Sequence, residues 1–289
     1  MTTIRTASQP AAYTSSRSSI TSALFLALIG LSATIYTLSS PSKIATEQPN
    51  KQPQSKEHHS VHSMMAQHKS AISTNNVNEH DPMKIISSTI SSIPYYHCGP
   101  HPDESTTELV LLHGAAFTKE DWKTSGILEK LCDLNNDEEG GDLTITALDL
   151  PVSATGEELT NVYDALVNEG VLSGRPVVVV TPSASGKSVV TLANDKEKLQ
   201  KVIKGWIPVA PPSVGQAADE TLGIFNELSI PILAIYGNQD DMGKKVTEKL
   251  VRLVENVKKV ELEGRHPVYL DSPEEFVMEV LQFLEEEQL

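Results

Sequence analysis

Short apolar segments alternate with helix-like segments from residue 84 to the end of the chain, and this alternation restricts the fold more than any other feature. The expected apolar strands are residues 108–112, 143–150, 176–181, 207–210, 231–236 and 258–262. Residues 84–93 are expected to add a first strand and residues 120–134 a single helix, and the last helix begins at the capping sequence Ser272-Pro273-Glu274-Glu275. Continuous apolar strands separated by helices are typical of a mostly parallel sheet covered by helices on both faces. The sequence therefore predicts one α/β domain over residues 84–289.

The first 83 residues have a different composition and are expected to lie outside this domain. Residues 1–19 form a polar segment with two arginines and no acid, and residues 20–38 contain no charged side chain. The second stretch is roughly long enough to cross a bilayer, so it is predicted to be a transmembrane signal anchor that places the protein in a membrane. A cleaved signal peptide, with secretion, and an organelle transit sequence are the alternatives. Residues 39–83, rich in Ser, Gln, Asn, Pro, Lys and His, are predicted to form a disordered linker.

The charge of the α/β domain restricts its partners. From residue 84 onward there are 17 Lys and Arg against 34 Asp and Glu. A nucleic-acid surface requires a basic patch, so nucleic acid is not an expected partner. Five of the nine histidines fall in residues 39–83, where no cysteine or acidic cluster completes a metal site, and no metal or cofactor is predicted. The two cysteines, Cys98 and Cys132, are expected as small buried side chains, with one bridge permitted but not implied.

The sequence T-P-S-A-S-G-K-S at residues 181–188 follows four consecutive valines and has two interpretations. It lacks only the first glycine of a phosphate-binding loop, in which Lys187 and Ser188 would be the working residues. It also matches the small-x-Ser-x-small pattern of a nucleophile elbow, in which Ser183 would be the working residue. Thr181 stands where the phosphate loop has its first glycine. Pro182 also disfavours that loop, because the loop binds phosphate through backbone N–H groups and proline has none. The local residues alone do not choose between the two.

Residues after later strands favour the nucleophile elbow. A serine hydroxyl needs a base, and the base needs an acid that orients it. Asp240 and Asp241 follow the strand expected at residues 231–236, and His266 follows the strand expected at residues 258–262. The order Ser, Asp, His is the order of an α/β-hydrolase triad. This pattern predicts Ser183 as nucleophile and His266 as base, and it leaves the acid open between Asp240 and its neighbour Asp241.

An acyl-transfer site also needs backbone donors for the oxyanion that forms during the reaction. One is expected from Ala184, which follows the nucleophile, and the other from the loop after the strand at residues 108–112. Within that loop Ala115 is the favoured donor and Ala116 the second choice, and His113 is interpreted as a structural loop residue. An oxyanion hole made by Ala115 and Ala184 is therefore predicted.

Several segments resemble the abhydrolase-domain-containing protein 14 group of the α/β hydrolases. They are V-L-L-H-G-A-A-F-T, A-L-D-L-P, T-P-S-A-S-G, G-W-I-P-V-A-P, I-Y-G-N-Q-D-D-M-G and H-P-V-Y-L-D-S-P-E-E-F. The resemblance covers residues 84–289 and implies Ser183 as nucleophile, Asp240 as acid and His266 as base. One form of the group has an N-terminal membrane anchor, which matches residues 20–38. The chain departs from the group at Val152, where the loop D-L-P-G-x-G loses its early glycines, and at Thr181, which replaces serine.

The pattern and the resemblance together predict a serine hydrolase that cleaves or transfers small acyl groups, without a cofactor. Only a short cap fits between residues 210 and 231, which favours a small acyl substrate over a long lipid chain. Two alternatives remain at this stage. The altered loop at Val152 permits a non-catalytic interaction protein on a hydrolase scaffold, whose protein partner the sequence does not name, and the Gly-Lys-Ser sequence permits a nucleotide binder.

Overall fold

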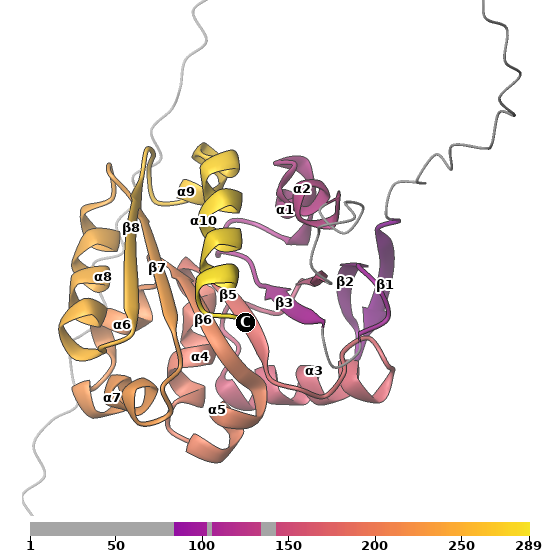
Figure 1. The fold of residues 1–289 in the computed structure, drawn as a ribbon, viewed down its shortest axis with the longest axis horizontal. Helices are drawn as coiled ribbons and strands as arrows, with labels where there is room; N and C mark the ends of the chain where they lie inside the picture. The colour runs from indigo at the N-terminus through magenta and orange to yellow at the C-terminus, as the bar shows by residue number, and fades with distance from the viewer. Residues whose placement is uncertain (1–83, 103–105, 134–142) are drawn as a thin grey trace, which may run out of the picture. The chain divides into compact units, whose positions relative to one another are not determined.

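The computed structural model describes residues 84–102, 106–133 and 143–289, and these residues contain one eight-stranded sheet (Figure 1). The strands are β1 (Ile86–Ile90), β2 (Ile93–Cys98), β3 (Thr107–Leu111), β4 (Leu143–Leu148), β5 (Val177–Pro182), β6 (Ile203–Val209), β7 (Ile232–Gly237) and β8 (Val257–Leu262). Their order across the sheet is β1-β2-β4-β3-β5-β6-β7-β8. The β1–β2 and β2–β4 pairs are antiparallel, and every pair from β4 to β8 is parallel. The expected mostly parallel sheet is therefore confirmed.

Helices connect the parallel strands, as the alternating pattern predicted. They are α1 (Lys119–Thr124), α2 (Ile127–Asp133), α3 (Gly156–Asn168), α4 (Gly186–Leu192), α5 (Lys196–Val202), α6 (Pro212–Gln216), α7 (Asp219–Glu227), α8 (Asp241–Leu253), α9 (Val268–Asp271) and α10 (Pro273–Glu286). A single 3-10 turn, Ser183–Ser185, separates β5 from α4.

The four valines of β5 pack against helices on both faces of the sheet. Because successive side chains of a strand point to opposite faces, Val177 and Val179 enter one apolar core while Val178 and Val180 enter the other. The first core contains residues of α3, α4, α5, α7 and α8, and the second contains residues of α1, α2 and α10. Figure 1 shows α10 over the sheet with α1 and α2 beside it, and α3, α5 and α7 along the opposite side.

Two expected elements are each divided in two by local turn residues. The segment expected as one strand at residues 84–93 is a hairpin, in which Ser91 and Ser92 both take positive φ values of 47° and 69°. The helix expected at residues 120–134 is broken into α1 and α2 by Gly126, which has a φ of 77°. The first turn is formed by two serines within a β-rich run of Ile, Ser and Thr, and the second by one glycine within a helical pattern, so neither pattern marks its turn clearly.

The two cysteines form a disulfide rather than two separate buried thiols. Cys98 ends β2 and Cys132 lies in α2, and their Cα atoms are 5.9 Å apart. That separation falls within the range that a disulfide requires. The expectation of two unlinked side chains is therefore wrong, since the packing of α2 on the sheet brings together residues that are 34 positions apart in the sequence.

The prediction of a membrane-spanning protein is corrected. Within residues 84–102, 106–133 and 143–289, no helix combines the length and the apolar character that a bilayer crossing requires. The longest helix described, α10, has 14 residues, which corresponds to a rise of about 21 Å against a hydrocarbon core of about 30 Å. The expected anchor at residues 20–38 lies outside the described residues, as do the polar segment at 1–19 and the linker at 39–83.

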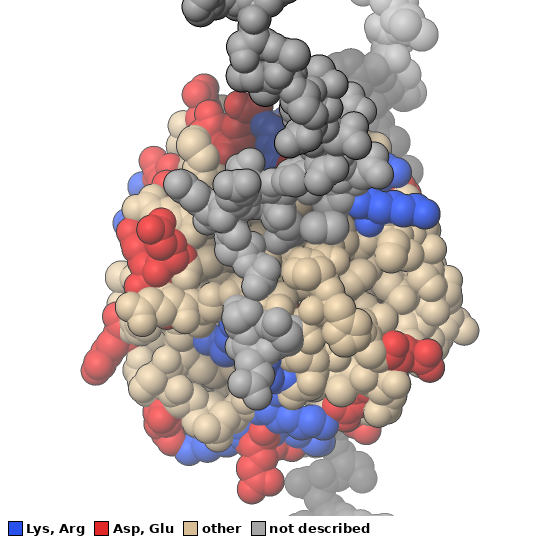
Figure 2. Space-filling view, turned by 45° about the vertical axis from the view of Figure 1, so that its right-hand side comes forward, with Lys and Arg blue, Asp and Glu red and all other residues tan. Residues whose placement is uncertain are grey.

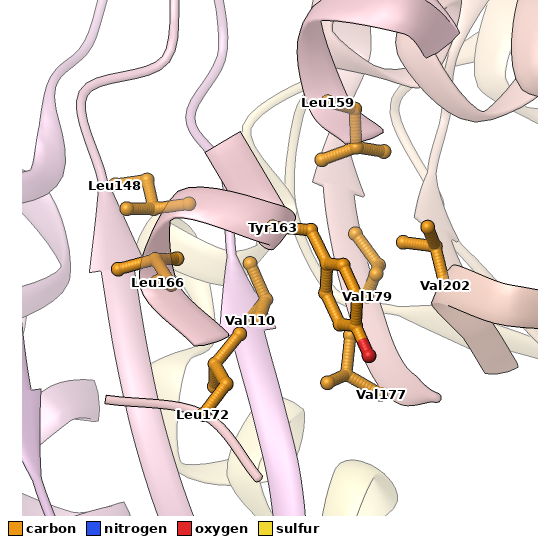
Figure 3. A pocket seen from close by; sticks show the side chains of 9 residues that line it. All are labelled: Val110, Leu148, Leu159, Tyr163, Leu166, Leu172, Val177, Val179 and Val202. Carbon is orange, nitrogen blue, oxygen red and sulfur yellow. The ribbon is translucent and has the colours of Figure 1, made fainter. Parts of the chain in front are cut away.

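The small cavity between α3 and the sheet is a packing gap (Figure 3). Side chains from β3, β4, β5 and α3 converge on a volume of about 10 Å³, which is at most enough for one water molecule. The Tyr163 ring lies among them, and its hydroxyl group donates to the carbonyl oxygen of Arg175 at 3.0 Å. The gap includes no residue of the site described below.

Charged side chains on the face shown in Figure 2 lie mostly around its margins, where blue and red groups are neighbours. Several lysines of the described residues pair with carboxylates on other elements, such as Lys201 with Asp164 at 2.6 Å and Lys130 with Glu274 at 2.5 Å. These pairs are exposed, so each contributes little to stability. That nucleic acid is not a partner stays a prediction from the net charge.

Candidate active site

Ser183 lies on a sharp turn between the end of β5 and α4. Its φ is 51°, a left-handed backbone conformation that is unfavourable for a residue with a side chain. Such strain is characteristic of a serine on a nucleophile elbow, where the turn holds the hydroxyl group above the carboxyl edge of the sheet. The four buried valines before it and the helix after it fix this turn from both sides.

The residues around Ser183 show why a glycine-poor elbow is tolerated. Thr181 is fully buried, and its Oγ1 atom accepts a hydrogen bond from the indole nitrogen of Trp206 at 2.8 Å. The close approach instead occurs at Gly186, where an added Cβ atom would lie 2.3 Å from the Cβ of Pro211. Gly186 is the only glycine in residues 181–188, and its lack of a side chain lets α4 pack against Pro211, which follows β6.

Lys187 and Ser188 do not form a phosphate-binding loop in this structure. The ammonium group of Lys187 donates to the carbonyl oxygen of Ser153 at 2.9 Å, which ties α4 to the altered loop after β4. Ser188 is 1% exposed, and its hydroxyl group donates to the carbonyl oxygen of Ser185. The two residues that a nucleotide would need are thus occupied in structural contacts.

Asp240 is held at the N-terminus of α8. Its Oδ1 atom accepts from the Gly243 amide at 2.9 Å, and the side chain is only 7% exposed. A Cβ atom at Gly243 would lie 2.4 Å from the Asp240 carboxylate, so only glycine permits this close contact. The neighbouring Asp241 is exposed in the first turn of α8. The structure thereby separates two carboxylates that the sequence pattern left equivalent.

His266 lies between the other two residues. Its Nδ1 atom is 2.6 Å from Asp240 Oδ2, and its Nε2 atom is 2.7 Å from the hydroxyl oxygen of Ser183. A carboxylate can only accept, so Nδ1 carries the proton and donates to Asp240. In the neutral ring Nε2 then accepts from Ser183. These three side chains come from loops after β5, β7 and β8, which end at the same edge of the sheet.

The loop that carries His266 is fixed by an ion pair beside it. The carboxylate of Asp271 accepts from the Arg265 backbone amide at 2.7 Å and from its guanidinium group at 2.6 and 3.0 Å. The Arg265 side chain holds the pKa of Asp271 below its ordinary value of 3.8. Ser272 does not cap α10 as expected, because its hydroxyl group donates to the Glu263 carbonyl and closes the same loop.

The loop after β3 is anchored at both ends. The indole nitrogen of Trp122 donates to the Leu112 carbonyl at 2.9 Å, and the Lys119 amide donates to the carboxylate of Asp149 at 2.6 Å. His113 is buried and its Nδ1 atom lies 3.0 Å from the Gly114 carbonyl oxygen. These contacts hold residues 114–117, including Ala115, in position opposite Ser183.

An apolar cavity of about 150 Å³ lies beside the Ser183 hydroxyl group. It is lined by residues 114–117 of the loop after β3, by Pro182 and Ser183, and by His266, Pro267 and Tyr269. Ala115 is therefore at the cavity wall, and Ala184 follows Ser183 in the 3-10 turn, where its amide has no intrahelical acceptor. The arrangement suits a small, mostly apolar group attached to a carbonyl.

Tyr269 is the cavity residue that the sequence did not single out. It is 1% exposed, its hydroxyl group has no hydrogen-bond partner among the described residues, and burial raises its pKa. A tyrosine in a short apolar segment gives no chemical signal in a single sequence. Among the described residues no group of three or more His, Cys, Asp or Glu is arranged to hold a metal ion.

The fold and the site together define the class of protein. A mostly parallel sheet, a serine on a strand-to-helix turn and an acid and a histidine after later strands form the architecture of an α/β hydrolase. A solved hydrolase from Thermoplasma acidophilum, described as CIB-like, matches with a TM-score of 0.53 and 19% identity over 72% of this chain and 100% of its own. MenH from S. aureus matches with a TM-score of 0.51 and 15% identity, over 68% of this chain and 99% of its own.

Sequence relatives narrow this class to one family. A rat protein named "Putative protein-lysine deacylase ABHD14B" is 33% identical over 191 residues, which cover 62% of this chain and 83% of the relative. Rat "Protein ABHD14A" is 29% identical over 203 residues, covering 68% and 78% of the two chains. No family model matches the chain. The chain belongs to the abhydrolase-domain-containing protein 14 family of the α/β hydrolases, as its motifs suggested.

Proposed function

We propose that this protein is a serine hydrolase that cleaves or transfers small acyl groups through Ser183, His266 and Asp240, and that residues 84–289 form its catalytic domain. The observation that carries the proposal is the unbroken chain of contacts from Ser183 Oγ through the His266 ring to Asp240, with distances of 2.7 and 2.6 Å. A buried carboxylate, a half-exposed imidazole and a strained serine in that order are the components of an activated nucleophile.

Each side chain has one task in the proposed reaction. The Ser183 oxygen attacks the acyl carbon while its proton passes to His266 Nε2. The negative charge on the acyl oxygen is held by the amides of Ala115 and Ala184. His266 then gives the proton to the leaving group, and an acyl-enzyme ester remains on Ser183. Water, or another acyl acceptor, removes the acyl group by the same steps in reverse, and Asp240 stabilises the charged imidazole throughout.

The cavity argues for a short acyl group. A mostly apolar space of about 150 Å³ accommodates a ligand about as large as benzene. Acetyl, propionyl and similar groups fit within it, whereas a long lipid chain would have to leave it. The name of the rat relative refers to acyl groups on protein lysine, so we include acetyl-lysine peptides beside small esters among the substrates to be assayed.

The proposal is tested by chemical labelling of Ser183. Wild-type protein is expected to hydrolyse p-nitrophenyl acetate and to be labelled covalently by a fluorophosphonate, and Ser183→Ala is expected to lose both. Because the alanine removes the attacking atom, the loss should leave only the background rate from the remaining groups. Mass spectrometry of the labelled peptide identifies the modified serine.

Ser153→Ala is the matched control. Ser153 lies in the loop beside α4, and only its backbone carbonyl is engaged, by Lys187. This variant should keep wild-type labelling and turnover. Undiminished labelling of Ser183→Ala would contradict the proposal, and a folded wild-type protein without any labelling would favour a non-catalytic interaction protein on the same scaffold.

A further inference from the structure

Tyr269 has a buried hydroxyl group for which stability alone gives no reason. Three buried side-chain polar atoms in the described residues lack a hydrogen-bond partner, and they belong to Glu129, Ser213 and Tyr269. Of these three residues, only Tyr269 lines the cavity beside Ser183. An unpaired buried hydroxyl destabilises the folded protein, and phenylalanine would fill the same space without that cost. A hydroxyl group at this position is explained if it donates a hydrogen bond to a bound ligand.

The aromatic ring of Tyr269 is held in place by its neighbours. Its centroid is 4.5 Å from that of Trp122, and the Phe117 ring meets it edge-on at 6.2 Å. Trp122 is itself fixed by its hydrogen bond to the Leu112 carbonyl. The Tyr269 oxygen is thus directed by packing and does not need to be ordered when a substrate binds, which is the preorganisation that transition-state stabilisation requires.

Tyr269 lines the same cavity as Gly114 and Ala115, which belong to the loop that is expected to supply a backbone donor to the oxyanion. Burial raises the pKa of Tyr269 and the nearby Gly114 backbone partly lowers it, although the two groups do not meet the geometry of a hydrogen bond. Gly114 also lies against the nucleophile, since a Cβ atom added to it would be 3.8 Å from the Cβ of Ser183. The next residue in the chain is Ala115, the expected backbone donor. Tyr269, Gly114 and Ala115 therefore border the cavity that Ser183 also lines.

The Tyr269 side chain has the protonation state of a donor. Burial raises its pKa well above neutrality, so the hydroxyl group keeps its proton at physiological pH. A neutral O–H group can donate to a developing negative charge, and such charge-assisted hydrogen bonds are about twice as strong as neutral ones.

We propose that the Tyr269 hydroxyl group donates a third hydrogen bond to the acyl oxygen of the substrate, beside the amides of Ala115 and Ala184. Tyr269 would then be a catalytic residue of the proposed acyl transfer, and this inference rests on that proposed function. The bond forms as the oxygen becomes negative, so it lowers the barrier more than it strengthens substrate binding.

The test compares Tyr269→Phe with wild-type protein on p-nitrophenyl acetate and p-nitrophenyl methoxyacetate. The expected result is a fall in kcat of about 100-fold or more on both esters, with KM changed by less than about threefold. A trifluoromethyl ketone, which forms a tetrahedral adduct with the serine, should lose affinity by the same factor as kcat/KM. The melting temperature should stay the same or rise, because the variant removes an unpaired buried group.

Tyr163→Phe is the matched control, since Tyr163 is another buried tyrosine whose hydroxyl group is paired with Arg175 outside the site. It should lose some stability and keep its kcat. Wild-type kcat in Tyr269→Phe would overturn the inference, as would a loss confined to the methoxyacetate ester or a loss that follows a lowered melting temperature. A folded wild-type protein inert toward both esters and the fluorophosphonate would instead overturn the proposed function, and the inference with it.

Discussion

The adjacent carboxylates of Asp240 and Asp241 have the same chemistry but different positions at the start of α8. Asp240 precedes α8, where its Oδ1 atom caps the helix at Gly243 and its Oδ2 atom meets the His266 ring. Asp241 is the first residue of the helix and points away into solvent. Asp240 is therefore a buried acceptor for the His266 ring, while Asp241, the next residue, is a surface charge.

This difference gives a prediction for a matched pair of variants. Asp240→Asn should lower kcat on p-nitrophenyl acetate by about a thousandfold or more, because the amide no longer stabilises the protonated imidazole. Asp241→Asn should stay within about threefold of wild type. Steady-state kinetics of both variants, with circular dichroism as a check on folding, decide the matter. Equal activity of the two variants would remove Asp240 from the mechanism.

Chain order was enough to predict which side chains meet, and local sequence was not enough to find every residue at the cavity. Ser183, Asp240 and His266 each follow a recognisable strand, and parallel strands end at one edge of a sheet. Tyr269 follows no such rule, since its position depends on how α9 packs under Trp122. The bond between Cys98 and Cys132 was left open as one permitted bridge and was not predicted, because tertiary packing alone makes these residues neighbours.

At the scale of elements, the short connection between β8 and α10 is held by polar contacts and not by a helix cap. The sequence predicted a capping box at Ser272, but the Ser272 hydroxyl group reaches back to the Glu263 carbonyl. Asp271 binds Arg265 across the same turn. Glu263 lies nine residues before Ser272, and Arg265 lies six residues before Asp271. These contacts close the loop that carries His266, and they take the place of the helix cap that the local sequence predicted.

The Asp271–Arg265 pair should make stability depend on pH at the acid end. The pKa of Asp271 is lowered in the folded protein, first by the hydrogen bond from the Arg265 side chain. The folded state therefore binds this proton less readily than the unfolded state, and its contribution is complete above pH 3.8 and lost as pH falls through the lower folded-state pKa. Arg265 is 72% exposed, so the contribution is expected to be about 1 kcal/mol.

Urea unfolding of wild-type protein and Asp271→Asn between pH 3 and pH 6 measures this contribution. The wild-type protein should be the more stable at pH 6, and the difference should shrink as the pH falls below 3.8 toward 3. A difference that stays constant across the range would show that the charge of Asp271 is not involved.

At the scale of the whole molecule, the disulfide links the second strand of the sheet, which pairs antiparallel with both of its neighbours, to helix α2. Cys98 ends β2, and Cys132 lies in α2, which packs with α1 and α10 in one apolar core. The bridge closes a loop of 34 residues. In the chain-entropy account, a loop of this length adds about 3 to 4 kcal/mol to the free energy of unfolding.

Loss of the bridge should therefore lower thermal stability. Cys132→Ser is expected to melt about 10 °C below the oxidised wild-type protein, as follows for a domain of this size. Dithiothreitol should lower the melting temperature of the wild type toward that of the variant and leave the variant unchanged. Identical melting with and without the reductant would contradict the prediction.

The parallel sheet has a consequence for the order of events during folding. Ser183 and His266 are 83 residues apart in the chain, and His266 and Asp240 are 26 apart, while β4 must insert between β2 and β3 before that end of the sheet is complete. Contacts between distant segments form slowly, because each closes a long loop. The three side chains can meet only after β5, β6, β7 and β8 have paired, so we expect labelling of Ser183 by a fluorophosphonate to appear late in refolding.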